Sequence, residues 1–447
     1  NWSGSTTAMC WRAVWRAAGV TYLSATFAKR ADTMGLYFRT VLGKMVDSVD
    51  ELTSIMETGG DQLQAILSNT LSRAGQLFRR ERSFKGIDTI EVRDTDNRGE
   101  HSRQADEATR ALRDIIRADT LFQKDAGKWK QWLVEQGYAS IGKGNKIAET
   151  ITKTSFASVA HNYIRQLMLG LKAGTAAERA IAALKRGERP TIALEHTMGS
   201  FLSEFVESKG AKEGDELVGF DYRYVLARGL ARSRRVKIKD KKGNEAYVTI
   251  PLEILSTPAI EAYEQALETI KRANVGIPVG PIDWIRQKLA DAGYSSKEIT
   301  NRNLTVDYTD PAHPKLTTRD SAEFDKVKSR AEFNSGQVDV LIMNVSGATG
   351  ASLHSSETFK DQRRRMMIVA QPMADINMFM QMLGRINRTG QVSSRETVTK
   401  SQALPKGAIE AYGLPYYELL SADLPAEVRP TAILMKKMKS LNANVSS

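Results

Sequence analysis

Two arginines and a glutamine at helical spacing are the residues of this chain best suited to phosphate chemistry. The segment 381–391 reads Gln-Met-Leu-Gly-Arg-Ile-Asn-Arg-Thr-Gly-Gln. At about 100° per residue, Gln381, Arg385 and Arg388 would lie within about 60° of one another on one helix face. Planar, permanently charged guanidiniums on a rigid helix can bind polyphosphate and stabilise charge on a transferred phosphoryl group. The alternative interpretation is a solvated basic helix face.

The same segment carries the features that would anchor such a helix. Asp375 can cap its start. Apolar residues then recur at the spacing of one buried stripe, namely Ile376, Phe379, Met380 and Leu383. The glutamine and the two arginines are therefore expected on the side that faces away from the core.

The residues upstream of this helix predict two strands and a loop. Segment 338–343 is a short apolar, β-branched run, which is typical of a buried parallel strand. It continues into segment 344–354, whose glycine and small hydroxyl residues allow close backbone approach to phosphate or sugar. Segment 364–369 predicts a second strand. The order is thus strand, small-residue loop, strand and paired-arginine helix.

This series resembles motifs V and VI of superfamily 2 helicases, in which a Gln-x-x-Gly-Arg-x-x-Arg helix carries the arginine finger of the second RecA-like lobe. In particular it resembles the Strawberry-notch-type helicase C-terminal domain of phages and mobile elements, through the strings at 350–354 and 361–365. The resemblance implies an α/β fold: a RecA-like helicase lobe with a parallel sheet, a large, mostly helical insertion, and the tail end of a first RecA-like lobe.

The resemblance also assigns roles to individual residues. Arg385 and Arg388 would be catalytic, acting on the γ-phosphate of ATP. The residues expected at the nucleotide are Gln381, Gly347, Gly350 and Gly384. The residues expected to contact nucleic acid, or to couple it to the ATP site, are Ser24, Thr26, His196, Thr197, Thr349, Arg363 and Arg364. ATP and Mg²⁺ would be held mainly by the first lobe, and no metal ligand is assigned to this chain.

Other strings place the remaining motifs and the domain boundaries. A strand at 20–23 that ends in Ser-Ala-Thr at 24–26 resembles motif III, and a strand at 191–195 before His196 resembles motif IV. The expected organisation is a remnant of the first lobe at 1–40, a helical insertion at 41–187, the second lobe at 188–400, and a C-terminal extension at 401–447. The opening of the chain, which lacks a methionine, suggests an excerpt from a longer protein.

Two segments imitate the nucleotide-binding motifs that this chain lacks. Segment 137–143 matches a phosphate-binding loop for seven positions, but Gly144 offers no hydroxyl for magnesium and the preceding residues look helical. Segment 106–109 imitates an acidic box inside a polar helical run. The sequence therefore carries the arginine half of an ATPase site, and the chain alone is expected to hydrolyse negligible ATP.

The sequence also predicts a basic β-hairpin, and two further strings resemble the family. Basic and apolar residues alternate in segment 235–239, and segment 241–244 has the composition of a turn. Segment 247–250 is again largely apolar, as expected for a second strand. The hairpin is either a strand-separating pin or a surface elaboration. The strings at 281–285 and 298–302 also resemble the family, with Asn301 where glycine is expected. Asparagine tolerates the left-handed conformation, so the turn can persist.

Composition limits the partners and the compartment. A chain of 447 residues has room for two or three domains, and its 64 Lys and Arg against 52 Asp and Glu give a net charge of +12. That excess favours a polyanion, and we expect DNA more than RNA. Cys10 is the single cysteine and no apolar stretch is long enough for a membrane span, which indicates the cytoplasm of a bacterial or phage-infected cell.

The leading hypothesis is the C-terminal portion of an ATP-dependent DNA helicase or translocase that works with a first RecA-like lobe, in the same polypeptide or as a partner chain. The alternative is a non-catalytic nucleic-acid-binding or scaffold protein that kept the second lobe. A motor subunit of a restriction or anti-restriction system is a third possibility. An in-frame phosphate loop and acidic box upstream of Asn1 would favour the first hypothesis.

Overall fold

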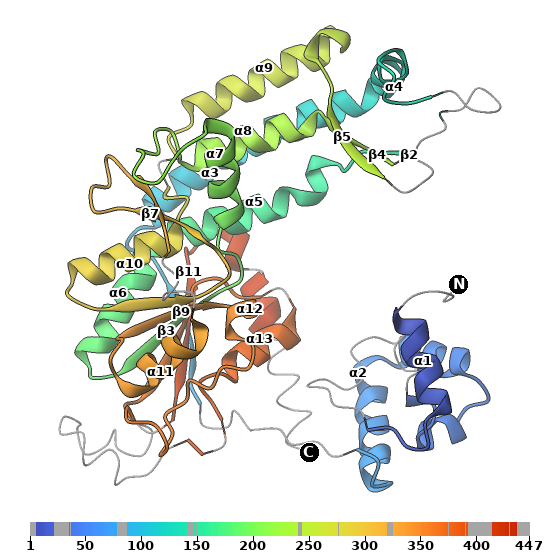
Figure 1. Ribbon diagram of the computed structural model, residues 1–447, viewed down its shortest axis with the longest axis vertical. Helices are drawn as coiled ribbons and strands as arrows, with labels where there is room; N and C mark the ends of the chain where they lie inside the picture. Colours follow the sequence, from blue (N-terminus) through green and yellow to red (C-terminus); the bar gives the residue numbers. More distant parts are fainter. Residues whose placement is uncertain are drawn as a thin grey trace. The chain divides into compact units, whose positions relative to one another are not determined.

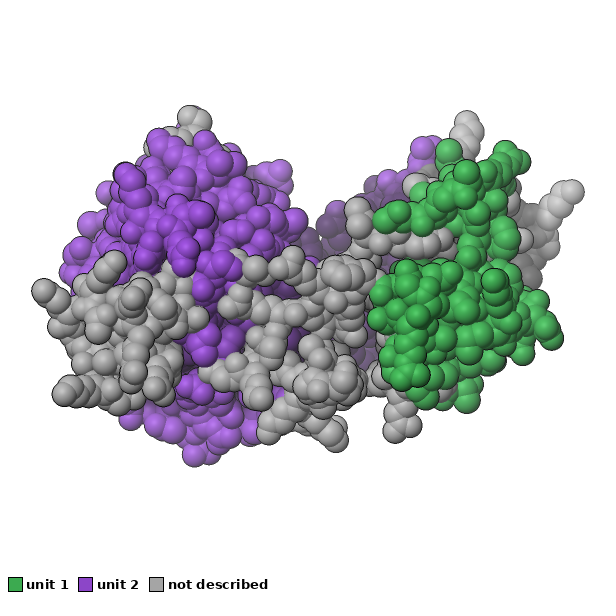
Figure 2. Space-filling view, turned by 90° about the horizontal axis from the view of Figure 1, so that it is seen from below, with its two compact units in different colours: residues 1–84, 437–447 green, residues 85–436 purple. Residues whose placement is uncertain are grey.

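The computed structural model divides into two compact units, one of residues 1–84 with 437–447 and the other of residues 85–436 (Figure 2). It describes residues 6–21, 35, 37–77, 87–140, 147, 150–239, 244–275, 277–319, 325–373, 375–388, 390–391, 414–428 and 430–435. Statements below refer to these residues. Among them, no helix has both the length and the apolar character needed to cross a membrane.

The smaller unit is helical where it is described. Its elements are α1 (Thr6–Arg16), η2 (Val41–Lys44) and α2 (Val49–Arg73). Val20 and Thr21, the first half of the strand predicted at 20–23, are not in a strand. Ser24 and Thr26 lie outside the described residues, so the resemblance to motif III stays a prediction.

A six-stranded parallel sheet forms the centre of the larger unit, in the order β1-β11-β10-β3-β9-β6 (Figure 1). Its strands are β1 (Thr89–Arg93), β3 (Arg189–Leu194), β6 (Ser296–Ile299), β9 (Val340–Asn344), β10 (Arg365–Val369) and β11 (Tyr416–Ser421). The predicted α/β fold with a parallel sheet is confirmed. The strands predicted from the apolar runs at 191–195, 338–343 and 364–369 are β3, β9 and β10.

The sheet extends beyond the interval 188–400 that the sequence suggested for the second lobe. The edge strand β1 comes from the segment assigned to the helical insertion, and β11 comes from the segment assigned to the C-terminal extension. Glu418 interrupts the apolar pattern of β11, yet it is buried because Arg179 of α6 binds it with two hydrogen bonds. A buried strand that contains a charged residue lacks a continuous apolar run, so it is hard to predict from the sequence.

Helices cover both faces of the sheet (Figure 1). On one face lie α6 (Ala173–Lys185) and α10 (Pro281–Asp291), which share a core with β3, β9 and β10. The inward face of α6 is built from alanines, whose small side chains allow the helix to approach the strands closely. On the other face lie α11 (Lys326–Ser335), α12 (Val345–Ala348) and α13 (Ile376–Leu383).

An arm of helices extends from this lobe (Figure 1). Its long helices pack around one apolar core; they are α3 (Arg98–Lys124), α5 (Phe156–Leu171), α7 (Gly199–Lys209), α8 (Tyr222–Ser233) and α9 (Thr257–Arg272). Smaller elements complete it: α4 (Ala126–Glu135), η3 (Leu252–Ile254), the three-stranded sheet of β2 (Thr150–Thr152), β4 (Arg235–Lys239) and β5 (Glu245–Thr249), and the hairpin of β7 (Leu304–Asp307) and β8 (Lys315–Thr318). The predicted basic hairpin is β4 and β5.

The two segments that imitate nucleotide-binding motifs are helical or follow a helix. Segment 106–109 lies inside α3, where Glu107 binds Arg103 and the backbone N–H of Asn274. Gly137 follows α4, whereas a phosphate loop would follow a strand. Lys143 lies outside the described residues. The interpretation that neither segment is a nucleotide site stays a prediction.

A buried network of charges joins α10 to β6, in the two strings at 281–285 and 298–302. Arg302 binds both carboxylate oxygens of Asp283 at 2.6 Å, and its Nε donates to Glu298 at 2.9 Å. Burial alone would raise the pKa of Glu298, but the charge and hydrogen bonds of Arg302, the charge of Arg319 and the hydrogen bond from Thr300 together lower that pKa to about 2. A buried guanidinium therefore holds two carboxylates and links a helix to an edge strand.

We expect Arg302→Met to lower the free energy of unfolding by about 3–5 kcal/mol at pH 7, because the buried Asp283 would lose the guanidinium that binds it and Glu298 would keep only Arg319. The Glu298 pKa lies below its unfolded value, so its stabilisation is present above about pH 4.5 and is lost as the pH falls toward 2. In the variant the buried Asp283 gains stability on protonation, so the deficit should shrink on acidification. Urea unfolding at pH 7 and pH 5 measures this.

Arg272→Met is the matched control, because Arg272 is exposed and pairs with Glu268 on the surface of α9. It should change the free energy of unfolding by less than about 1 kcal/mol. An equal effect of both substitutions would contradict the structural role of the Arg302 network.

Candidate functional site

The paired arginines follow α13 and are not part of it. The sequence predicted one helix through Arg388, but α13 ends at Leu383 and residues 384–386 form turns. The physical reason is Gly384, since glycine disfavours a continuing helix. The predicted cap is confirmed, because Asp375 accepts a hydrogen bond from the Met378 N–H at 3.2 Å. Gln381 lies exposed within α13, whereas both arginines lie beyond its end, so the three side chains do not share one helix face.

Two hydrogen bonds join this turn to the loop that follows β9. The Leu353 N–H donates to the carbonyl of Arg385 at 2.9 Å, and Nη1 of Arg388 donates to Oγ of Ser352 at 2.9 Å. Nε of Arg388 also donates to the Gly384 carbonyl at 3.3 Å. The two motifs that the sequence placed in series are therefore in direct contact.

Arg385 is partly buried without a carboxylate. Its Nε is buried and has no hydrogen-bond acceptor, and the described residues give its guanidinium no ion pair. Burial lowers the pKa of Arg385, and the positive charge of Arg388 lowers it further. By contrast, the four arginines of this unit that are almost fully buried each have a carboxylate partner; they are Arg189, Arg302, Arg319 and Arg365.

Asn387 is a buried polar residue that the sequence reasoning missed. It is 3% exposed, and the described part of the chain provides no hydrogen-bond partner for its Oδ1 or Nδ2. Unpartnered buried amides are rare in folded proteins and suggest a binding site or a missing ligand. The signal in the sequence was the position of Asn387 between the two arginines, on the side predicted to face the core.

The small-residue loop after β9 begins with the single turn α12. Asn344 caps it by accepting a hydrogen bond from the Gly347 N–H at 2.9 Å. A Cβ at Gly347 would lie 1.4 Å from the carbonyl oxygen of Ile299, so packing against β6 requires this glycine. Gly350 has a positive φ of 72° and open space around it, and Thr349 is exposed. The sequence had attributed these glycines to phosphate approach, whereas the structure gives each a local reason.

The carboxyl ends of β3 and β10 meet at a buried glutamine. The Gln371 Oε1 accepts hydrogen bonds from the backbone N–H groups of Glu195 and His196, and its Nε2 donates to the Arg165 carbonyl in α5. Burial lowers the pKa of His196. Thr197 follows, and its hydroxyl accepts from the Gly199 N–H at 3.4 Å. The sequence did not single out Gln371, which joins the arm to this edge.

Arg363 and Arg364 lie at the opposite, amino-terminal edge of the sheet. Arg363 binds Asp361, which also pairs with the buried Arg189. The guanidinium of Arg364 lies 4.4 Å from the ring centroid of Tyr416 and donates to a backbone carbonyl. These contacts fix both arginines around the start of β10, away from the strand ends that carry His196 and Thr197.

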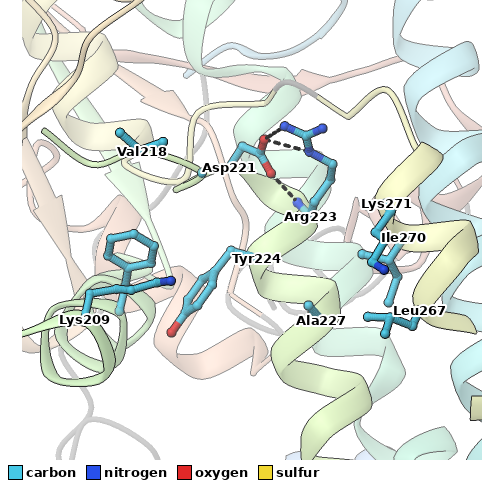
Figure 3. A pocket seen from close by; sticks show the side chains of 11 residues that line it. Lys209, Val218, Asp221, Arg223, Tyr224, Ala227, Leu267, Ile270 and Lys271 are labelled. Carbon is cyan, nitrogen blue, oxygen red and sulfur yellow. Dashed lines mark hydrogen bonds and ion pairs between the residues drawn. The ribbon is translucent and has the colours of Figure 1, made fainter. Parts of the chain in front are cut away.

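A groove on the arm shares no residue with these motifs (Figure 3). It has a volume of about 340 Å³ and lies among α7, α8 and α9, with Tyr224 and Leu267 in its walls and Lys209 and Lys271 at its rim. Arg223 at the same rim is neutralised by Asp221. No cluster of metal-ligating side chains occurs in the part of the chain that the structure describes.

We expect Gly347→Ala to lower the free energy of unfolding by about 2–3 kcal/mol, because the new methyl group would collide with a backbone carbonyl that cannot rotate away. Gly350→Ala is the control: it should cost about 1–2 kcal/mol, from the left-handed backbone alone. Hydrogen exchange should also show a less protected Leu353 N–H only in the first variant. Equal costs and equal protection would contradict the close approach of the loop to β6.

Comparison with known proteins identifies the region that contains these motifs. Residues 282–404 match the family model of the C-terminal domain on Strawberry notch homologues. The chain is 24% identical over 184 residues to Protein strawberry notch of Drosophila melanogaster and 23% identical over 187 residues to Protein strawberry notch homolog 2 of Homo sapiens. Each match covers 40% of this chain but only 10% and 12% of the relatives. No solved structure matches significantly. Residues 282–404 therefore resemble the helicase C-terminal domain found on Strawberry notch homologues.

Proposed function

We propose that this chain supplies the second-lobe half of the ATP site in an ATP-dependent DNA helicase or translocase of superfamily 2. One observation carries the proposal: Arg385 is partly buried beside Arg388 and has no carboxylate partner among the described residues. Burying a guanidinium next to another positive charge, without a carboxylate of its own, is unfavourable, so the position of Arg385 favours an anion. The anion that we assign is the γ-phosphate of ATP, presented by a first RecA-like lobe.

The residues present fit the phosphate end of a nucleotide and not its magnesium ion. Two guanidiniums supply planar donors for phosphate oxygens, whereas the described residues contain no cluster of carboxylates or histidines that could hold a metal. When bound between the lobes, ATP supplies the phosphoryl group that is transferred to water. Mg²⁺ and most of the nucleotide are therefore assigned to the first lobe.

Within this site, each arginine acts through its position. Ser352 and the Gly384 carbonyl orient the guanidinium of Arg388, and the hydrogen bond from Leu353 fixes the backbone at Arg385. Fixed donors stabilise the negative charge that develops on the γ-phosphate oxygens without having to reorganise during the reaction. We assign His196, Thr197 and Thr349 to the surface that contacts DNA. We assign the protein to the cytoplasm.

Arg388→Ala should reduce the turnover of the enzyme that contains both lobes by roughly a thousandfold, because a finger arginine acts on charge that develops in the transition state. Nucleotide binding should change much less, and Arg385→Ala should act similarly. Lysine at either position should restore little, since a flexible point charge cannot reproduce the planar fork. Single-turnover ATP hydrolysis and a nucleotide-binding titration measure these effects on the same preparations.

The matched control is Arg113→Ala, which removes an exposed guanidinium of α3 and should leave turnover unchanged. The 447-residue chain without the first lobe provides the baseline, with negligible hydrolysis. A non-catalytic scaffold would show no ATP turnover even with the first lobe present. Normal hydrolysis in both alanine variants would exclude the arginine-finger assignment.

A further inference from the structure

The three-stranded sheet of the arm has one buried and one exposed face. Val236, Ile238 and Val248 point into a core that also contains residues of α4. The alternate positions carry Arg235, Lys237 and Lys239 on β4 and Glu245 and Tyr247 on β5, and we call these five residues the outer sheet face. Figure 1 places this sheet at the end of the arm farthest from the parallel sheet.

An exposed tyrosine lies at the centre of the outer sheet face. Tyr247 is 56% exposed, and it is directly opposite Lys237 in the antiparallel register. The guanidinium carbon of Arg235 lies 4.6 Å from the ring centroid, and the Lys237 ammonium lies 5.9 Å from it. A single exposed aromatic residue is ordinary on a protein surface. An exposed ring with two cations over it on an open sheet offers planar groups for stacking and donors for phosphate.

Glu245 is the only carboxylate on the outer sheet face. It pairs with Lys237 at 2.6 Å and lies 3.9 Å from Lys239. The hydrogen bond between Glu245 and Lys237 raises the pKa of the lysine and lowers that of the glutamate. Three cations against one carboxylate leave a positive surface, and a phosphate arriving there would compete with Glu245 for the lysines.

We propose that the outer sheet face binds a single strand of DNA, with a base stacked on Tyr247 and the neighbouring phosphates on Arg235, Lys237 and Lys239. The choice of DNA rests on the proposed function, but the geometry of the face does not depend on the ATP site. Stacking on an aromatic ring tolerates any base, and the cations follow the backbone, so the binding is independent of sequence. The tip of the hairpin has no part in the assignment.

Binding of a fluorescent oligo-dT to the full chain, measured by anisotropy without nucleotide at about 50 mM salt, tests the proposal. Tyr247→Ala should weaken binding roughly tenfold, because one stacked base is lost. Tyr247→Trp should retain affinity, and the added fluorescence should be quenched by the oligonucleotide. Glu245→Gln should tighten binding severalfold, because it removes the carboxylate that competes with phosphate for Lys237.

Tyr138→Ala is the matched control. Tyr138 is another exposed tyrosine of the arm, at 51%, but it packs against Trp132 and has no cation over its ring among the described residues. This variant should bind like the unaltered chain. Equal affinity of the Tyr247→Ala variant and the unaltered chain would overturn the proposal, and so would Glu245→Gln binding more weakly. If the unaltered chain bound oligo-U more tightly than oligo-dT, and Tyr247→Ala abolished this preference, the choice of DNA would be wrong.

The proposed ATP site and the proposed binding of DNA by the outer sheet face can be tested independently. Because the oligonucleotide titration contains no ATP, a normal turnover in both Arg385→Ala and Arg388→Ala would remove the ATP assignment and leave the outer sheet face untouched. Conversely, oligonucleotide binding that is insensitive to Tyr247, combined with a thousandfold loss of turnover in Arg388→Ala, would leave the proposed function standing.

Discussion

The central strands are buried on both faces, and this constraint determines where the lobe can place charge. Every residue of β3, β10 and β11 is buried between the two helical layers. A polar side chain there needs a partner inside the protein, as Glu418 has in Arg179. Functional groups that must meet a ligand are therefore restricted to the ends of strands and to the segments that follow them. The arginine pair, the loop after β9 and the ends of β3 and β10 all obey that restriction.

Arginines at the two ends of the parallel sheet differ in their partners. At the amino-terminal edge Arg189 and Arg365 are almost fully buried, and both pair with Asp361. Burial of Arg365 still lowers its pKa to about 10. Arg385 is less buried, yet it lacks such a carboxylate. The arginines that are almost fully buried thus have a carboxylate partner, whereas the described residues provide none for the partly buried Arg385.

The sequence predicted the parts of the fold whose signals are local. Apolar β-branched runs identified β3, β9 and β10, and alternation identified the hairpin of β4 and β5. It did not predict β1 or β11 as sheet strands, because their pairing depends on partners far along the chain. The end of α13 was predictable in principle, since Gly384 stands there. The reason for Gly347 was not, because the Ile299 carbonyl that it packs against belongs to another strand.

The candidate site was predictable in its residue types but not in its electrostatics. The spacing of Arg385 and Arg388 predicted that they lie together, whereas their burial and the absence of a carboxylate among the described residues depend on the fold.

The connection of the arm to the lobe also depends on contacts between distant parts of the chain. Gln371 ties the ends of β3 and β10 to the Arg165 carbonyl in α5, and Arg165 in turn binds Glu195. Because α5 packs with α3 and α8 in one continuous core, a displacement of these strand ends is resisted along the helices of the arm. The outer sheet face is therefore connected to the lobe by packed helices, since the core beneath β4 and β5 also contains Phe122 of α3 and Ala259 of α9.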